Sequence, residues 1–186
     1  MAGDAQATRR RLLSAARDEF AEHGIAGARV DRIAVAARSN KAQIYHYFGS
    51  KDDLFDAVFH ELVLDTVRET PLDATDLPGY AARLFDRFEE RPQIARLATW
   101  YQLERAEGRP PVQARVASNK EKIARIAKAQ KAGDLPSTYA AADLLALVVT
   151  IASMWTAMGP EFVTTRQSRA HRRRVVTTAV EAVLAA

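Results

Sequence analysis

The sequence of 186 residues contains no cysteine and only 8 glycines and 7 prolines. The absence of cysteine excludes disulfides, thiol nucleophiles, iron–sulfur clusters and cysteine-based zinc sites. The few glycines and prolines are clustered, which leaves long uninterrupted stretches for helices, and no window alternates apolar with polar residues as a strand does. The sequence therefore predicts an all-α fold.

Long hydrophobic runs are also lacking. The longest, Leu144 to Trp155, is interrupted by Thr150 and Ser153 and is shorter than the roughly 20 residues that span a bilayer. The polar start, Met1-Ala2-Gly3-Asp4, is not followed by an apolar signal segment. We therefore expect a cytoplasmic protein without a membrane partner.

The net charge of +4 is small, but the charges are unevenly distributed. Residues 1–50 hold 8 basic and 5 acidic side chains. Residues 51–110 hold 8 basic and 13 acidic ones, and residues 111–186 hold 11 basic and 5 acidic ones. A basic N-terminal segment followed by an acidic middle segment indicates that the two parts of the chain have different roles. We expect the basic run Arg172-Arg173-Arg174 to stay solvated, or to pair with the acidic middle of the same chain or of a partner subunit.

Apolar residues at helical spacing, separated by clustered helix breakers, predict about nine helices. In the first one, Leu12, Ala16 and Phe20 recur on one face and Gly24 ends the helix. Asn40 is placed to cap the third helix. The expected helices are about Ala5–His23, Val30–Ala37, Lys41–Phe48, Lys51–Arg68, Tyr80–Glu90, Pro92–Glu107, Pro111–Ala132, Thr138–Met158 and Ser168–Ala185.

Three helices in the first 50 residues, the last two short and joined by Arg38-Ser39-Asn40, predict a helix-turn-helix. Ile44 and Phe48 are the inward positions of its third helix. The outward face offers Lys and Gln to base edges and Tyr hydroxyls to phosphates, as reading of the major groove requires. Backbone amides near Arg29 and the side chain of Lys51 are expected to add phosphate contacts. The alternative for Tyr45 or Tyr47 is packing against the first helix, and for His46 a solvated position. The predicted DNA-binding residues are Arg29, Asn40, Lys41, Ala42, Gln43, Tyr45, His46, Tyr47 and Lys51.

An ordered series of residues surrounds this motif. It consists of Thr8-Arg9, Leu13-Ser14-Ala15-Ala16, Phe20-Ala21-Glu22-His23-Gly24, Val30, Ile33-Ala34, Ala37, Ile44-Tyr45-His46-Tyr47-Phe48, Ser50-Lys51 and Leu54. In its order and spacing, over about a quarter of the chain, the sequence resembles the TetR family of bacterial transcriptional regulators. Two positions depart from the family's pattern: Arg38 stands where the family usually has Gly, and Ala28-Arg29 where it usually has a hydroxyl residue.

The resemblance implies a homodimeric repressor that a small molecule releases from a near-palindromic DNA operator. It divides the chain into a DNA-binding domain, 1–50, and a ligand-binding and dimerisation domain, 51–186. In such proteins the helices of the second domain enclose a mostly apolar pocket, so a lipophilic or aromatic effector is expected. For any single pocket candidate, core packing is the simpler alternative. The candidates are Phe85, Phe88, Trp100, Tyr101, Met154, Trp155, Met158 and Phe162.

Two apolar helices at the C-terminal end resemble the family's dimer interface, a four-helix bundle between subunits. The alternative is that each apolar stripe packs inside its own subunit. The predicted interface residues are Leu144, Leu147, Val148, Ile151, Val176, Val180, Val183 and Leu184.

Two rival functions remain open from the sequence. An enzyme has little support, because the sequence lacks a Gly-rich phosphate loop and a Ser-centred nucleophile motif, and its four His residues are scattered. We expect no cofactor and no metal. The other rival is a helical module that binds a small molecule or a partner and has weak or lost DNA binding, an interpretation that Arg38 and Ala28 favour.

Overall fold

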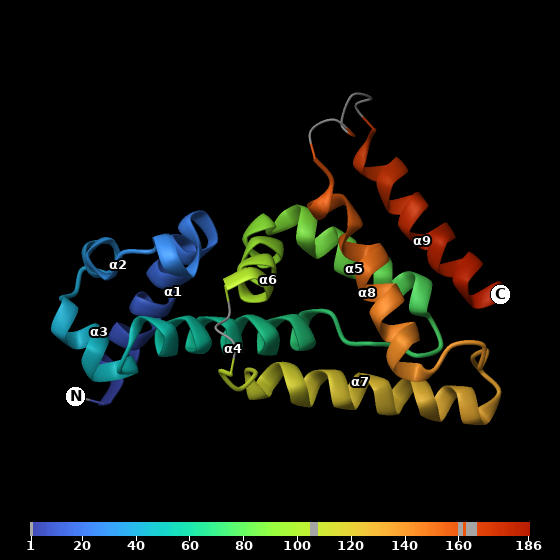
Figure 1. Ribbon diagram of the computed structural model, residues 1–186, viewed down its shortest axis with the longest axis horizontal. Helices are drawn as coiled ribbons and strands as arrows, with labels where there is room; N and C mark the ends of the chain where they lie inside the picture. Colours follow the sequence, from blue (N-terminus) through green and yellow to red (C-terminus); the bar gives the residue numbers. More distant parts are fainter. Residues whose placement is uncertain (1, 105–107, 160–161, 163–166) are drawn as a thin grey trace. The chain divides into compact units, whose positions relative to one another are not determined.

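The computed structural model describes residues 2–104, 108–159, 162 and 167–186. Within these residues the chain forms nine α-helices and no strand, which confirms the predicted all-α fold (Figure 1). The expected extension of the sixth helix to Glu107 falls outside the described residues. The helices are α1 (Ala2–Gly27), α2 (Val30–Ala36), α3 (Lys41–Phe48), α4 (Lys51–Glu69), α5 (Leu77–Glu90), α6 (Pro92–Glu104), α7 (Gln113–Ala132), α8 (Ala141–Ala157) and α9 (Arg169–Ala185).

The chain divides into two compact units. The first unit comprises Met1–Leu64 and Gln93–Arg115, and the second comprises Asp65–Pro92 and Val116–Ala186. The first unit thus holds α1, α2 and α3, most of α4, and α6. These compact units differ in extent from the domains 1–50 and 51–186, whose division of function stays a prediction.

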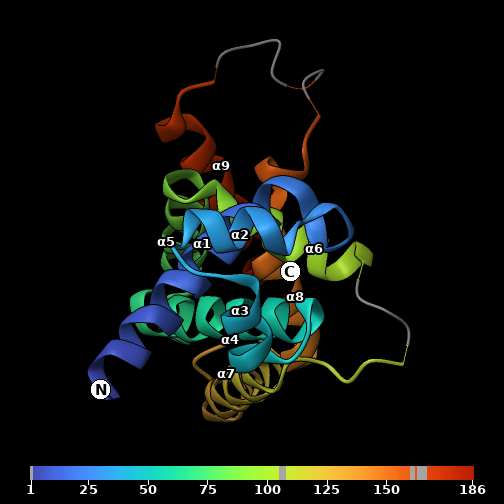
Figure 2. The same ribbon diagram turned by 90° about the vertical axis from the view of Figure 1, so that its left-hand side faces the viewer.

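The first unit is built around apolar side chains of its helices. The expected stripe of α1 is buried: Leu12, Ala16 and Phe20 are 0% exposed, and the Phe20 ring meets the Phe55 ring of α4 edge-on, with centroids 5.2 Å apart. Ile44, the predicted inward residue of α3, is also fully buried. Figure 2 shows the short helices α2 and α3 toward the viewer. Burial of Ile44 determines which face of α3 points outward.

The second unit has its own core, in which α8 and α9 pack against α5 (Figure 1). The core includes Tyr80 and Phe85 of α5, Val148 of α8 and Val180 of α9, all of them buried. Burial of its hydroxyl raises the pKa of Tyr80 to about 12. Although α8 is strongly apolar, none of the described helices is both long and hydrophobic enough to cross a bilayer.

Ion pairs join α5 to α9 at the edge of this core. Arg173 donates a hydrogen bond to Asp86 at 2.8 Å, and Arg172 pairs with Glu89. The preceding Arg169 donates to Asp86 at 2.9 Å. For Arg172 and Arg173 the structure therefore confirms pairing with the acidic middle of the same chain, one of the three expected alternatives.

Helix α5 begins earlier than the expected Tyr80. It starts at Leu77 because the Asp76 carboxylate accepts a hydrogen bond from the Gly79 backbone N–H at 2.8 Å. Pro78 fits here because the first turn of a helix needs no N–H from it. A sequence stretch rich in helix breakers therefore forms the start of a helix.

The turn after α2 carries the one non-glycine residue with positive φ among those described. Arg38 has φ 51°, the left-handed conformation that glycine usually supplies. Its N–H donates to the Val35 carbonyl at 3.0 Å, and the N–H of Ser39 donates to the Ala34 carbonyl at 2.9 Å. These two hydrogen bonds form a Schellman motif with Arg38 at the position after the C-cap. The turn therefore keeps the geometry of a glycine-containing turn without the glycine.

Replacing this arginine with glycine is expected to stabilise the protein. Arg38→Gly removes the steric cost of a Cβ atom at positive φ, so we expect the free energy of unfolding to rise by about 1 kcal/mol. The measurement is urea or thermal unfolding followed by circular dichroism. Arg38→Ala is the matched control, because alanine keeps the Cβ atom and should leave stability near that of the wild type. Equal stability of the glycine and alanine variants would contradict the assigned strain.

Candidate nucleic-acid interface

Helix α3 presents a polar face that is anchored from behind. Ile44 is buried and Phe48 is half-buried, whereas Gln43 and His46 are exposed and the Tyr45 side chain is 46% exposed. Lys41 and Ala42 are exposed as well, and Tyr47 is half-buried beside the His46 ring. The structure thus brings the predicted α3 residues together on one short helix, and most of them reach solvent.

The start of α3 is fixed by its cap. Asn40 precedes the helix in an extended conformation, and its Oδ1 accepts a hydrogen bond from the Gln43 backbone N–H at 2.9 Å. The cap predicted for Asn40 is therefore confirmed. The Lys41 ammonium pairs with Asp31 of α2 at 2.9 Å, and both side chains are about half exposed. An exposed ion pair of this kind contributes little free energy, so breaking it to let Lys41 contact a phosphate costs little.

The start of α2 is held by a carboxylate from α1. Glu19 accepts hydrogen bonds from the Arg29 backbone N–H and from Arg32 Nε, each at 2.8 Å. Burial of Glu19 acts to raise its pKa, but the hydrogen bonds from Arg32 and Arg29 outweigh burial and hold the pKa below its ordinary value. The side chain of Arg29 itself points to solvent. The first turn of α2, where a phosphate contact is predicted, is thereby held against α1.

Lys51 takes a position that the sequence did not indicate. Its ammonium group donates hydrogen bonds to the carbonyls of Ala26 and Ala28, at 3.1 and 3.2 Å. These carbonyls lie at the junction of α1 and α2, so Lys51 ties the start of α4 to that junction. Its predicted phosphate contact stays a prediction, and the structure adds a positioning role.

Helix α6 contributes two side chains that the sequence analysis did not assign to this interface. Glu104 accepts hydrogen bonds from the backbone N–H groups of Ile25 and Ala26, at 2.5 and 2.9 Å. The indole of Trp100 donates to the Ala21 carbonyl at 3.4 Å. Between these contacts, Gly24 breaks α1 at φ 72°, and a Cβ atom there would lie 2.9 Å from Glu104 and 3.1 Å from the Trp100 ring. Close packing by α6 therefore requires a glycine at this corner.

The predicted ligand-binding residues are dispersed. Trp100 and Tyr101 lie in the first unit, where the Tyr101 ring stacks on Phe59 with centroids 4.3 Å apart. In the second unit Phe85 is buried, whereas Phe88, Met154 and Trp155 are half-buried. Met158 and Phe162 are 38% and 60% exposed. The eight residues are thus divided between the two compact units, and their role in ligand binding stays a prediction.

The predicted dimer residues separate into two groups. Leu144, Val148, Val176 and Val180 are at most 1% exposed and pack in the core of their own unit. This is the alternative that the sequence analysis left open, and in this conformation a partner subunit cannot touch these four side chains. The residues that are only partly buried are Leu147, Ile151, Val183 and Leu184.

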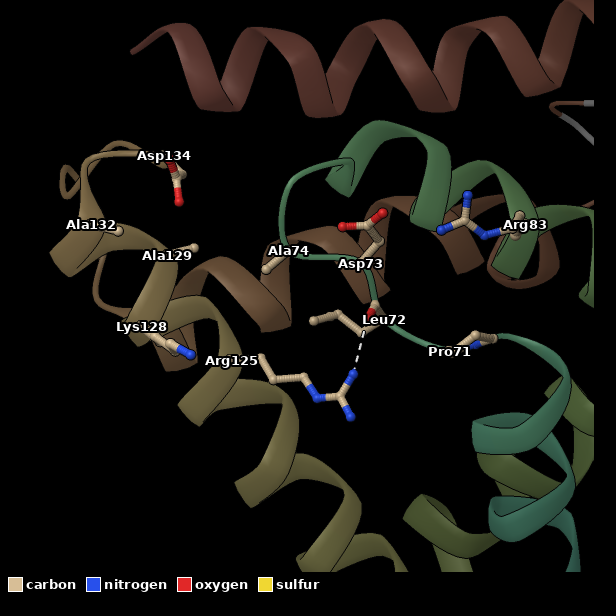
Figure 3. A pocket seen from close by; sticks show the side chains of 10 residues that line it. All are labelled: Pro71, Leu72, Asp73, Ala74, Arg83, Arg125, Lys128, Ala129, Ala132 and Asp134. Carbon is tan, nitrogen blue, oxygen red and sulfur yellow. Dashed lines mark hydrogen bonds between the residues drawn. The ribbon is translucent and has the colours of Figure 1, made fainter.

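A pocket of about 650 Å³ lies in the second unit, between the α4–α5 loop, α5 and α7 (Figure 3). The guanidinium of Arg125 is directed at the Leu72 carbonyl, 3.4 Å away. Charged residues of both signs line the pocket beside apolar ones. The lining residues are Pro71, Leu72, Asp73, Ala74, Arg83, Arg125, Lys128, Ala129, Ala132 and Asp134.

Comparison with known families gives matches in both parts of the chain. A family model described as "Bacterial regulatory proteins, tetR family" matches residues 12–58, which contain α2 and α3. Another, described as "Tetracyclin repressor-like, C-terminal domain", matches residues 76–182. The two matches together span more than half of the chain.

Individual relatives agree with these matches. The HTH-type transcriptional repressor SCO4008 of Streptomyces coelicolor is 39% identical over 161 residues, which cover 86% of this chain and 83% of that protein. The solved structure of the putative transcriptional regulator SCO4942 from Streptomyces coelicolor is 42% identical in sequence and has a TM-score of 0.82. The match covers 95% of this chain and 97% of that chain. A TetR family regulator from Marinobacter aquaeolei, 21% identical, has a TM-score of 0.76 with 98% of each chain covered, and shows the shared fold alone.

The Glu19 contacts predict a pH-dependent contribution to stability. Because the pKa of Glu19 is lowered in the folded protein, its stabilisation is complete above the pKa of an unfolded glutamate and is lost as the pH falls through the lowered value. We expect Glu19→Gln to lower the free energy of unfolding by about 1–2 kcal/mol at pH 7 and by less in acid. Urea unfolding at several pH values between 3 and 7 measures this difference. Glu22→Gln, at an exposed site on the same helix, is the control and should leave the free energy of unfolding nearly unchanged. A loss of stability in Glu19→Gln that is the same at every pH would refute the assignment.

Proposed function

The chain belongs to the TetR family of bacterial transcriptional regulators, and from this membership we propose that it is a repressor which a small molecule releases from DNA. It is a DNA-binding transcriptional regulator with a helix-turn-helix. In the proposal, α3 enters the major groove and the first turn of α2 meets the sugar–phosphate backbone. Two subunits read a near-palindromic operator through successive grooves about 34 Å apart.

The polar face of α3 is the observation that carries the proposal. Gln43 and Tyr45 are exposed on a helix whose opposite side is anchored by the buried Ile44. Gln pairs with base edges through two hydrogen bonds, and a Tyr hydroxyl donates to a phosphate. The cap by Asn40 and the Glu19 contact hold the starts of both helices in place, so the face is preformed.

Two further observations support repression by a symmetric dimer. SCO4008, which is 39% identical over most of both chains, is named a transcriptional repressor. On α8 and α9, Leu147, Ile151, Val183 and Leu184 keep part of their apolar surface exposed, as an interface between subunits needs. These four residues form the proposed contact between subunits, and the four buried residues of the predicted set support them from behind.

The effector is proposed to bind in the second unit, for which the structure offers two places. The first is the pocket lined by Leu72, Arg125 and Lys128, whose volume falls in the range of small-molecule sites. The second is the α8 surface around Trp155, because the indole N–H of Trp155 is buried without an acceptor among the described residues. An effector that prefers the conformation unable to bind DNA, with a coupling of roughly 1–3 kcal/mol, lowers operator occupancy about 5–150-fold.

Two substitutions on α3 test the interface. Gln43→Ala should relax sequence choice, because the variant cannot pair with a base edge, at a cost of about 1–3 kcal/mol for the preferred operator. Tyr45→Phe should instead weaken binding to all sequences alike, because phenylalanine has no hydroxyl to donate to a phosphate. The measurement is fluorescence anisotropy with a duplex selected by the wild type from a random pool and with a scrambled duplex. Gln113→Ala, at an exposed glutamine outside the motif, is the matched control.

Wild-type binding by both α3 variants would remove these residues from the interface. Failure of the wild type to select any duplex would overturn the proposal as a whole. It would favour the rival function, a helical module without DNA binding.

An effector is sought by thermal shift against a small-molecule library and checked by release of the selected duplex. If the effector occupies the pocket, Lys128→Ala should reduce the shift, whereas Lys131→Ala on the same helix should not, because Lys131 does not line the pocket. If the effector binds at α8, Trp155→Phe should reduce the shift and Lys128→Ala should not. A compound that shifts all variants equally contradicts both places, and a bound compound that leaves the duplex in place contradicts release.

A further inference from the structure

The turn between α2 and α3 carries an exposed cation, Arg38, that has no partner among the described residues. The side chain of Arg38 is exposed, and no hydrogen bond or ion pair of its guanidinium occurs among the described residues. Two neighbouring cations of the same motif are engaged, Arg32 with Glu19 and Lys41 with Asp31, whereas the side chain of Arg29 is exposed like that of Arg38. The guanidinium of Arg38 is therefore available to a ligand outside the chain.

The backbone of Arg38 does not need this side chain. The hydrogen bonds of the turn are made by backbone groups, namely the N–H of Arg38 to the Val35 carbonyl and the N–H of Ser39 to the Ala34 carbonyl. Glycine would form the same bonds at φ 51° without the steric penalty of a Cβ atom. An arginine at this position lowers stability, and no contact inside the described structure offsets that cost. Strained backbone of this kind clusters at functional sites, which indicates a function for the side chain of Arg38.

The position of Arg38 in the motif indicates which ligand its guanidinium contacts. In a docked helix-turn-helix, the first helix crosses the sugar–phosphate backbone and the start of the second lies in the major groove. The turn that joins them is therefore near the phosphates at the edge of the groove. Arginine is suited to this contact because its planar, permanently charged fork donates two parallel hydrogen bonds to a phosphate.

We propose that Arg38 binds a backbone phosphate of the DNA, and that the protein carries a strained turn in order to place this guanidinium. The inference rests on the proposed function, in which α3 occupies the major groove. It adds a contact that a glycine, the family's usual residue in this turn, cannot make, since glycine has no side chain to offer. It also predicts that stability and DNA affinity change in opposite directions when the residue is replaced by glycine.

The test compares Arg38→Gly, Arg38→Ala and Arg38→Lys with the full-length wild type. Thermal unfolding gives stability, and anisotropy titrations between 50 and 200 mM salt give affinity for a selected duplex and for a scrambled duplex of the same length. For Arg38→Gly we expect the Tm to rise by about 2–4 °C, with affinity for both duplexes falling by about 3–10-fold. The slope of log K against log salt should become shallower by about 0.9 for each phosphate that the variant no longer neutralises.

The other two variants separate the backbone from the side chain. Arg38→Ala should show the same reduced affinity and salt dependence as Arg38→Gly without the gain in Tm. Arg38→Lys should keep the salt slope, because its charge still reaches the phosphate. The proposal is overturned if the glycine and alanine variants bind like the wild type, or if only the glycine variant is weakened, which would assign the effect to the turn's backbone. It is also overturned if the weakening is confined to the selected duplex with an unchanged slope, which is the result for a base contact.

These outcomes are distinguishable from failure of the proposed function. If the wild type binds neither duplex, the function itself is wrong. If the wild type binds with a salt-dependent affinity that Arg38 does not influence, only the role of Arg38 is wrong.

Discussion

The architecture of the first unit depends on how the protein stabilises the corner where α1 ends and α2 begins. The chain leaves helical geometry at Gly24, so the regular hydrogen bonding of α1 is interrupted there and some backbone groups lack helical partners. Side chains from separate helices supply those partners: Glu104 accepts from two N–H groups, Lys51 donates to two carbonyls, and Glu19 accepts from the N–H of Arg29. By bonding these backbone groups, the three charged residues fix where α2 starts and hence how the motif is held.

This constraint connects the fold with function. A recognition helix reads sequence only when its position relative to its neighbours is fixed, because base contacts depend on hydrogen-bond geometry. Within the first unit the corner holds α2, the buried Ile44 holds α3, and the cap by Asn40 sets its first turn. Helix α6 takes part through Glu104 and Trp100, so a change in α6 alters the support of the corner directly.

Local patterns in the sequence predicted most of the fold and the polar face of α3. The spacing of Leu12, Ala16 and Phe20, the position of Asn40 and the break at Gly24 are signals within a few residues, and the structure agrees with each. Glu104 was missed because its partners lie nearly eighty positions earlier in the chain, and no local pattern records such a contact. Aromatic composition placed Trp100 among the pocket candidates, yet tertiary packing uses it against α1. The pocket itself is lined largely by charged and small residues, which a search for aromatic side chains does not find.

Hydrogen–deuterium exchange of the protein with and without a selected duplex tests the central claim most directly. The first N–H groups of a helix have no helical partner and exchange readily, so a bound phosphate or base edge slows them. When the duplex is bound, we expect slower exchange at the starts of α2 and α3 and in the turn that contains Arg38. Exchange that slows only in the second unit, or nowhere while the duplex is bound, would contradict it.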